Sequence, residues 1–245
     1  MSVPPFSVRV LLIQVRERPD VEEQEQRCFI ERLGIRPDQL DAVNIDREPI
    51  PSPSRVGAAN AVMIGGSGVY SVTQEHTFTT ALRDVVLRLC DTGKPTFGVC
   101  WGHQFIAQTL GGNVVTDVDS AEAGTHEVTL TSQGRADPLF TDRPDRFAAH
   151  MGHHDCVATM PPGAILLARS TRCPHQAFRI AGKPIYGTQF HCELNSQRLV
   201  KRLDIYRHLY MPDDKAFEAF RDSPTPTPEA DQILRRFLTH VVVGS

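Results

Sequence analysis

The sequence predicts an α/β fold built on a mostly parallel β-sheet. Apolar, β-rich segments alternate with segments of helical periodicity along the first 112 residues, an order typical of parallel strands joined by right-handed crossovers. The first segment, residues 7–15, becomes a continuous apolar run, as expected for a strand that is covered on both faces. Glycines close the helical segments, which fits their role at helix ends.

Two helices are predicted in the N-terminal part. The first begins after Asp20, which we expect to be the N-cap with Glu23 completing a capping box, and it ends at Gly34. The second begins at Phe78, has apolar residues at i, i+3, i+4 and i+7, and is closed by Gly93. The intervening segments are predicted strands at residues 41–45 and 60–64 and a proline-rich loop at 49–53.

Beyond residue 112 the pattern changes to short β-rich segments and then to helices. The predicted strands are residues 113–118, 126–131, 147–151, 156–160, 165–170, 176–180 and 185–190, the last two forming a hairpin. Two amphipathic helical patterns follow, marked by Leu199, Leu203, Tyr206 and Tyr210 and by Ala230, Ile233, Leu234, Phe237, Leu238 and Val241, with a stiff, exposed proline-rich connector at 223–228. We expect these helices to cover the sheet edge rather than to form a lid.

The composition narrows the class of protein. With 245 residues, 40% hydrophobic and 22% charged, the chain is long enough for one large globular α/β domain. A net charge of -3 gives no reason to expect nucleic acid or an anionic membrane as a partner. The apolar run at residues 10–15 is too short to span a membrane and lacks a signal-peptide pattern. The six scattered cysteines favour reduced thiols, so we expect a cytoplasmic protein.

A cysteine stands where a predicted strand at residues 96–99 turns into a helix. Gly98 and Gly102 flank Cys100, and the helical pattern begins near His103. Small residues on both sides let strand and helix pack closely, so the cysteine is expected in a strained turn with its side chain exposed. The N-terminal end of a helix favours a thiolate there. The pattern predicts a nucleophile; the alternative is a buried structural cysteine.

His191 and Glu193 end the last predicted strand. Residues i and i+2 of an extended chain face the same way. Glu193 can therefore orient the imidazole of His191 while His191 faces Cys100, which is the arrangement of an acyl-transfer triad. The alternative is a solvated surface pair.

The loop Gly65-Gly-Ser-Gly68 follows a predicted strand and lets backbone N–H groups approach a substrate oxygen. The N–H of Trp101 would be a second donor of an oxyanion hole, where one donor contributes roughly 3 kcal/mol of transition-state stabilisation. The alternative is a plain turn. No Gly-Lys-Ser/Thr ending follows, so the loop is not a phosphate loop.

The segment His150-Met-Gly-His-His-Asp155 contains metal-ligand residue types. Adjacent side chains of a strand point to opposite faces, so this spacing does not assemble a tetrahedral site by itself. We therefore predict no metal, and nothing in the sequence calls for a cofactor.

Several separated motifs together resemble the class I glutamine amidotransferases, in particular the glutaminase domain of GMP synthase and its stand-alone relatives. The motifs, in the order seen in that family, are Gly65-Gly-Ser-Gly68, Gly98-Val-Cys-Trp-Gly-His-Gln104, His153-His-Asp155, Pro161-Pro-Gly-Ala164 and Tyr186-Gly-Thr-Gln-Phe-His-Cys-Glu193. The resemblance covers roughly residues 8–195. It implies a three-layer, flavodoxin-like open sheet, with an amidotransferase-like domain at residues 1–195 and a helical extension at 196–245 packed on the same domain.

The resemblance also implies residue roles. Cys100 would attack the side-chain amide of glutamine, with His191 as base and then acid and Glu193 orienting it. The oxyanion N–H groups would be those of Gly66 and Trp101. Residues that would hold the amino and carboxylate ends of the glutamyl group are Gln104, Gly152 and His153. The sequence departs from the family pattern at His154, which is usually a small residue, and at Cys192, which is usually proline; both changes affect the expected substrate preference.

Three functions fit this reading. The first is a self-sufficient hydrolase of a γ-glutamyl amide, acting on glutamine or on a γ-glutamyl peptide or conjugate. The second is a glutaminase subunit that supplies ammonia to a separate synthase, since the chain has no Ser-Gly-Gly-x-Asp-Ser loop of an ATP-pyrophosphatase; an exposed apolar patch near Cys100 would favour it. The third is an inactive binding or scaffold protein, which the complete Cys, His and Glu set argues against.

Overall fold

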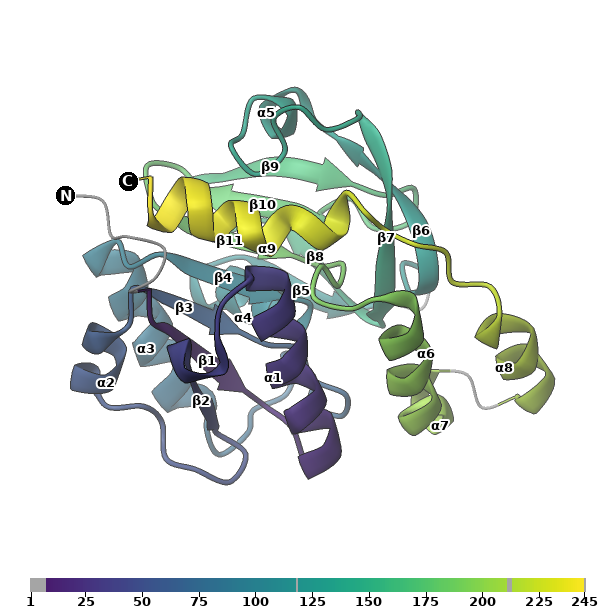
Figure 1. Ribbon diagram of the computed structural model, residues 1–245, viewed down its shortest axis with the longest axis horizontal. Helices are drawn as coiled ribbons and strands as arrows, with labels where there is room; N and C mark the ends of the chain where they lie inside the picture. Colours follow the sequence, from purple (N-terminus) through teal and green to yellow (C-terminus); the bar gives the residue numbers. More distant parts are fainter. Residues whose placement is uncertain (1–7, 118, 211–212, 245) are drawn as a thin grey trace.

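The computed structural model describes residues 8–117, 119–210 and 213–244. Within these ranges the chain forms a nine-stranded sheet of order β2-β1-β3-β4-β11-β10-β9-β6-β7 and a two-stranded sheet, β5-β8 (Figure 1). The strands β2, β1, β3, β4 and β11 pair in parallel. The strands from β11 to β7 pair antiparallel. The predicted α/β class, with a large mixed sheet flanked by helices, is confirmed.

The element bounds follow the predicted order. The strands are β1 (Val10–Gln14), β2 (Leu40–Asn44), β3 (Ala61–Ile64), β4 (Thr96–Val99), β5 (Asn113–Thr116), β6 (Glu122–Leu130), β7 (Arg146–His153), β8 (Asp155–Thr159), β9 (Ala164–Arg169), β10 (Ala177–Ile180) and β11 (Ile185–Thr188). The helices are α1 (Pro19–Leu33), η2 (Pro37–Gln39), α2 (Pro53–Ala58), α3 (Thr79–Thr92), α4 (Trp101–Thr109), α5 (Ser132–Arg135), α6 (Ser196–Ile205), α7 (Arg207–Tyr210), α8 (Asp214–Arg221), η3 (Ala230–Gln232), α9 (Ile233–Arg236) and η4 (Phe237–Val242).

The parallel half of the sheet lies between two layers of helices. Alternate residues of β1 point to opposite faces, so Leu12 joins the apolar cluster with Phe29 of α1, whereas Leu11 joins the cluster with Val86 of α3. The C-terminal helix packs on the same face as α1, and α4 packs on the same face as α3. Both faces are therefore buried, which explains the continuous apolar run in β1.

Helix starts differ from the predictions at two places. Helix α1 begins at Pro19 with Arg18 as N-cap, so the prediction of Asp20 as N-cap is wrong. Proline has a fixed φ that suits the first helical position, and Asp20 lies in the first turn instead. Helix α4 begins at Trp101, directly after Cys100 and before the expected start near His103. The predicted strand at 113–118 ends as β5 at Thr116, while residues 7 and 118 lie outside the described ranges.

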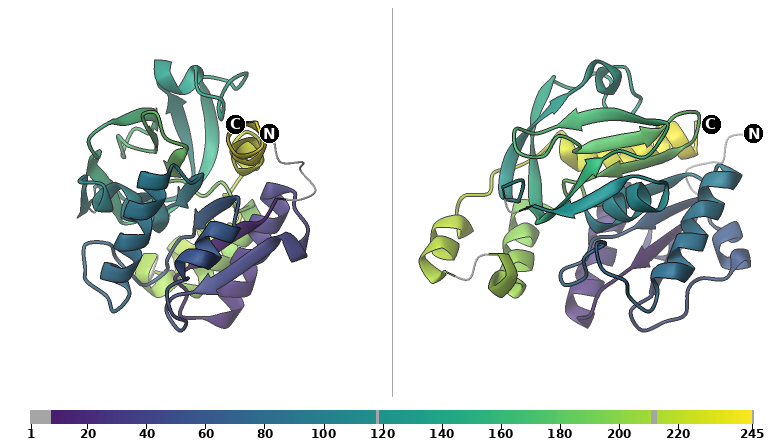
Figure 2. Two further views of the ribbon diagram at one scale, coloured as in Figure 1. Left: turned by 90° about the vertical axis from the view of Figure 1, so that its left-hand side faces the viewer. Right: turned by 180° about the vertical axis from the view of Figure 1, so that it is seen from behind.

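The C-terminal helices cover more than the sheet edge. Ile233, Leu234 and Phe237 are almost completely buried in the main core cluster, on a face of the sheet. Helices α6, α7 and α8 gather at one end of the molecule (Figures 1 and 2), where Leu199 and Phe217 share a smaller cluster. The prediction of a sheet-edge cover is therefore corrected to a face cover, and a domain boundary at residue 195 stays a prediction. In the described residues, no helix combines the length and apolar character that a membrane span requires.

Candidate active site

The turn at Cys100 joins β4 to α4 in a strained backbone conformation. Cys100 has φ 51° and ψ -103°, a region that non-glycine residues rarely occupy. A methyl group added to Gly98 would lie 2.5 Å from the carbonyl carbon of Gly102, and one added to Gly102 would lie 2.2 Å from the carbonyl oxygen of Ile64. The two glycines therefore allow the close approach of strand and helix that the sequence predicts.

Cys100 lies in a cavity of about 280 Å³. Its side chain is not exposed as predicted, because only 4% of the residue is accessible. Leu209 and Tyr210 of α7 line the same cavity. The volume lies just below the range for drug-sized pockets, roughly 300 to 1,000 Å³. An amino-acid-sized ligand therefore fits it best.

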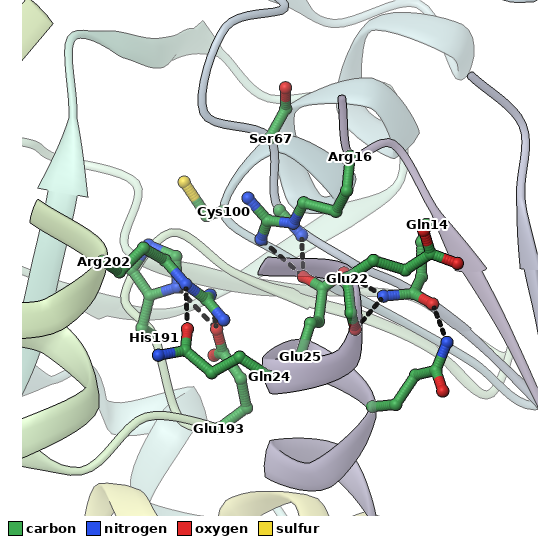
Figure 3. Close-up of polar contacts among 12 residues, drawn as sticks. Gln14, Arg16, Glu22, Gln24, Glu25, Ser67, Cys100, His191, Glu193 and Arg202 are labelled. Atoms are coloured by element: carbon green, nitrogen blue, oxygen red, sulfur yellow. Dashed lines mark hydrogen bonds and ion pairs between the residues drawn. The ribbon is translucent and has the colours of Figure 1, made fainter. Parts of the chain in front are cut away.

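His191 and Glu193 form a buried pair beside Cys100 (Figure 3). Nδ1 of His191 lies 2.8 Å from Oε1 of Glu193. The other ring nitrogen, Nε2, would lie 3.7 Å from a methyl group added to Gly152, whose carbonyl oxygen is 3.7 Å from Sγ of Cys100. The imidazole and the thiol thus meet at Gly152. The backbone N–H of His191 also donates to the carbonyl of His150 at 2.8 Å, which fixes the chain beyond β11.

Charges around this pair decide its protonation. Burial alone lowers the pKa of His191, but the charges of Glu193 and Cys100 outweigh burial and raise the pKa to about 10. Burial alone raises the pKa of Glu193, but His191 and Arg202 outweigh it and lower the pKa to about 2. At neutral pH the pair is therefore an imidazolium and a carboxylate, and His191 holds a proton that it can deliver to a leaving nitrogen.

Arg202 of α6 is a site residue that the sequence reasoning missed. Its Nη1 donates to Oε1 of Glu193 at 3.1 Å, and its Nε donates to Oε1 of Gln24 at 3.0 Å (Figure 3). Leu199 and Leu203 mark the buried face of α6, and Arg202 lies on that face. A charge on the apolar face of a helix is the sequence signal that could have found it.

The glycine loop is packed against side chains from other elements. The N–H of Gly66, a predicted oxyanion donor, donates to Oε1 of Glu25 at 3.1 Å. A methyl group added to Gly65 would lie 2.7 Å from the same oxygen, and one added to Gly68 would lie 2.1 Å from Cζ of Tyr206. Trp101 begins α4, so its N–H has no acceptor within the helix and points out of the helix N-terminus near Cys100. Both oxyanion roles stay predictions.

The predicted substrate-binding residues all line the cavity: Gln104, Gly152 and His153. Two of them already bond within the protein. The Gln104 amide donates to the carbonyl of Asp155 at 2.7 Å and to Oε1 of Gln189 at 3.0 Å. The ring of His153 lies 3.1 Å from the same carbonyl through Nδ1 and 3.2 Å from Oε2 of Glu122 through Nε2. These contacts make both residues rigid parts of the wall, and their contact with a substrate stays a prediction.

The histidines at 150–155 point in different directions. Nδ1 of His150 contacts Thr125, His153 contacts Glu122, and the ring of His154 stacks on Tyr210 with centroids 4.5 Å apart. In the described residues no group of three or more potential metal ligands converges. Cys192, the other departure from the family pattern, is fully buried and contacts Oγ1 of Thr188 at 3.7 Å. His154 therefore borders the cavity, while Cys192 belongs to the main core cluster.

Comparison with known proteins agrees with this geometry. The sequence model of the family described as glutamine amidotransferase class-I matches residues 33–203. The chain therefore belongs to the class I glutamine amidotransferase family, as the sequence resemblance indicated.

Among its relatives the chain is similar to several GMP synthases. It is 34% identical over 167 residues to the GMP synthase of Aeropyrum pernix, covering 67% of this chain and 29% of the relative. It is 32% identical over 142 residues to that of Streptococcus mutans, covering 57% and 26%. The chain thus spans less than a third of the length of these relatives.

Solved structures share the fold over nearly the whole chain. A glutamine amidotransferase of Thermotoga maritima aligns with a TM-score of 0.76 at 22% identity, covering 97% of this chain and 99% of the other. A glutamine amidotransferase of Methylobacillus flagellatus aligns with a TM-score of 0.70 at 18% identity, covering 95% of each chain. At these identities the alignments show a common fold.

Proposed function

We propose that this protein hydrolyses a γ-glutamyl amide, either glutamine or a γ-glutamyl peptide or conjugate, through a thioester on Cys100. The observation that carries the proposal is that Cys100 and the buried His191–Glu193 pair lie next to one another: a methyl group added to Gly66 would lie 3.5 Å from Cε1 of His191 and 3.8 Å from Cβ of Cys100. A buried, oriented imidazole next to a thiol on a helix N-terminus is the arrangement required for nucleophilic catalysis by cysteine.

The chemistry would take two steps. Sγ of Cys100 attacks the amide carbon, and the electron pair of the C=O bond moves to oxygen. When the C=O bond re-forms, the C–N bond breaks, His191 gives its proton to the nitrogen, and ammonia or an amine leaves. Water then attacks the thioester, His191 takes a proton from the water, and the C–S bond breaks to release the carboxylic acid product and the thiolate, which restores the starting state. Glu193 keeps the imidazole in one orientation throughout.

The test is release of glutamate from glutamine and from a small panel of γ-glutamyl peptides. Cys100→Ala should lower the rate on the order of 10⁴-fold or more, because the nucleophile of a triad cannot be replaced. Cys90→Ala is the matched control, since Cys90 is a partly buried thiol on α3 that lines no cavity at Cys100. The preferred substrate would identify the γ-glutamyl compound. No release from any substrate, with Cys100 unreactive towards an electrophilic glutamine analogue, would support a binding or scaffold role instead.

A second candidate function is supply of ammonia to a separate synthase, as the name of the GMP synthase relatives suggests. Val69 and Leu209 are 45% and 42% exposed, and both line the cavity at Cys100. Exposed apolar side chains at the mouth of a site favour a docking partner. If this proposal is correct, glutamate release should rise when the synthetase subunit of a GMP synthase is added, and Leu209→Asp should abolish the increase. An unchanged rate would leave the self-sufficient hydrolase.

A further inference from the structure

The N–H of Gly66 is already bonded within the protein. Its acceptor, Oε1 of Glu25, also accepts from Nη2 of Arg16 at 2.5 Å, and Oε2 of Glu25 accepts from Gln14 at 2.8 Å (Figure 3). The Glu25 side chain is fully buried. Three donors thus hold this carboxylate against the glycine loop. A substrate oxygen would have to compete with a buried carboxylate for the Gly66 N–H, which is unfavourable because such charge-assisted bonds are strong.

The guanidinium of Arg16 borders the reacting groups. A methyl group added to Gly66 would lie 3.1 Å from Nη2 of Arg16, 3.5 Å from Cε1 of His191 and 3.8 Å from Cβ of Cys100. The cation, the imidazole and the thiol-bearing carbon therefore surround one point. Of the Arg16–Glu25 ion pair, the positively charged guanidinium is the group that lies next to this point.

A small cavity gives Arg16 access to His191. Its volume is about 20 Å³, and Arg16, Gly152 and His191 are among its lining residues. About 10 to 15 Å³ is enough for one water-sized group, so a single oxygen atom fits. Ser67, Gly68, Gly152 and Tyr210 line this cavity and also the larger one at Cys100, so the two adjoin. In the described residues Glu25 lines neither of them.

Arg16 has N–H donors that its ion pair with Glu25 does not use. Arginine has five N–H groups, and Glu25 is the acceptor for Nη2. Nε of Arg16 is buried without a hydrogen-bond partner among the described residues, and the residue is 1% exposed. A buried ion pair contributes little net stability compared with apolar residues of the same size. Stability alone therefore does not explain why the Arg16–Glu25 ion pair lies at this point.

We propose that Arg16 is a catalytic residue, the second oxyanion donor of this site in place of the N–H of Gly66, and that Glu25 fixes its guanidinium in that position. The inference rests on the proposed function. The negative charge forms on the amide oxygen when Sγ of Cys100 attacks, and again when water attacks the thioester. The N–H of Trp101 and the guanidinium of Arg16 would donate hydrogen bonds to that oxygen. These hydrogen bonds weaken when the C=O bond re-forms and the negative charge leaves the oxygen.

The topology supports this assignment. Arg16 follows β1 and the glycine loop follows β3, and these two strands are neighbours in the sheet. In the sheet β2 lies on one side of β1 and β3 lies on the other. The order in which the chain adds strands therefore reverses between β1 and β3. Ligands of open α/β sheets bind in the crevice beyond such a switch point.

The experiment replaces the whole ion pair, so that no charge is left buried alone. In the double variant R16M/E25M apolar residues of similar size fill the space, which keeps a buried pair's site stable. We expect kcat for glutamine, or for the preferred γ-glutamyl substrate, to fall about 100- to 1,000-fold with KM nearly unchanged, as for loss of one oxyanion donor. The midpoint of thermal unfolding should stay close to that of the wild type.

Two further measurements separate catalysis from structure. Alkylation of Cys100 by iodoacetamide forms no oxyanion, so its maximal rate at high pH should be the same in R16M/E25M and wild type. Arg18→Met is the matched control, because Arg18 is exposed and paired with Asp20. If R16M/E25M does not fold, R16Q/E25Q keeps hydrogen bonding between the two positions and is judged by the same criteria.

The outcomes are distinct. An R16M/E25M variant as active as the wild type would overturn the role of Arg16 while the proposed function stands. A more active variant would overturn it too, and would mean that Glu25 holds back the N–H of Gly66. An equal fold-decrease in kcat and in the maximal rate of alkylation would mean that Arg16 has only a structural role. A wild type without Cys100-dependent turnover would overturn the proposed function itself, and this inference with it.

Discussion

The two sides of the cavity at Cys100 are built in different ways. On one side a single stretch, β4 and α4 with Cys100 between them, supplies the turn, and the obstacles around its glycines are backbone atoms. On the other side the glycine loop is packed against the side chains of Glu25, Arg16 and Tyr206, which come from α1, from the segment after β1 and from the junction of α6 and α7. Similar glycine patterns therefore have different physical causes: mainly backbone atoms limit the space at the turn, and side chains limit it at the loop.

The largest effect is expected from a change in the turn at Cys100. In Gly102→Ala the new methyl group would meet the backbone of Ile64 at 2.2 Å, and neither partner can move aside. We expect a loss of about 3 kcal/mol or more in the free energy of unfolding, at the upper end for overpacking. Urea unfolding measures it.

The matched control for this prediction is Gly57→Ala. Gly57 lies in α2 and has no atom within 4 Å of an added methyl group. We expect this variant to be as stable as the wild type or about 0.4–1 kcal/mol more stable. A similar loss in both variants would contradict the backbone-obstacle explanation.

The next largest effect concerns Arg202, which lines the smaller cavity at His191. Arg202→Met removes a bond to Glu193 and lets the carboxylate and His191 shift. We expect kcat to fall about 10- to 100-fold with little change in KM, since a misplacement of about 1 Å can cost about 100-fold. Arg198→Met is the control, because Arg198 lies on the same helix and pairs with the exposed Glu31. Partial recovery in Arg202→Lys would identify a positioning role; full activity of Arg202→Met would exclude one.

Gly68→Ala should have a smaller effect on stability, and a second substitution at Tyr206 should suppress most of it. The added methyl group would meet the ring of Tyr206 at 2.1 Å, and a side chain can be removed. We expect a loss of about 1–3 kcal/mol in the free energy of unfolding. In a Tyr206→Ala background the same change should cost much less, so a double-mutant cycle measures the coupling. Identical losses in both backgrounds would mean that the loop, like the turn at Cys100, is limited by backbone.

The last prediction concerns the pH dependence of stability. The pKa of His191 is raised from 6.5 to about 10, so its contribution to stability is complete below 6.5 and is lost as pH rises through 10. The pKa of Glu193 is lowered from 4.5 to about 2, so its contribution is complete above 4.5 and is lost as pH falls through 2. The stability difference between wild type and His191→Gln should therefore be constant from pH 4.5 to 6.5 and decrease towards pH 10. A difference that stays constant to pH 10 would contradict the assignment of the charged pair.

The sequence predicted the parts of the site that depend on short spacings. Gly98 and Gly102 around Cys100 allow a close strand-to-helix turn, because a methyl group added to Gly98 would meet the backbone of Gly102 and His103. His191 and Glu193 are two residues apart in an extended segment, so their side chains lie on one side, and the structure places them 2.8 Å apart. Helix α3 was predicted from apolar residues at helical spacing, which is also a short-range pattern.

Two charged residues on helix faces were beyond this reasoning. Glu25 lies between Val21 and Phe29 on the buried face of α1, and Arg202 lies on the buried face of α6. A helical period shows that such a charge is buried, but the partner that compensates it lies nine residues earlier, outside the helix, where helical periodicity gives no information. Arg16 and Glu193 are those partners.

The sequence by itself therefore determined the fold class, the family and the strained turn at Cys100, because strand alternation, helical period and glycine spacing act within a few residues. Tertiary structure alone decided that Cys100 is buried in a cavity that α7 also lines and that the N–H of Gly66 bonds to Glu25. It also decided that the C-terminal helix covers a sheet face. These outcomes depend on which distant side chains fill the same space, since a buried charge or a buried N–H group takes whichever partner the packed fold brings within reach.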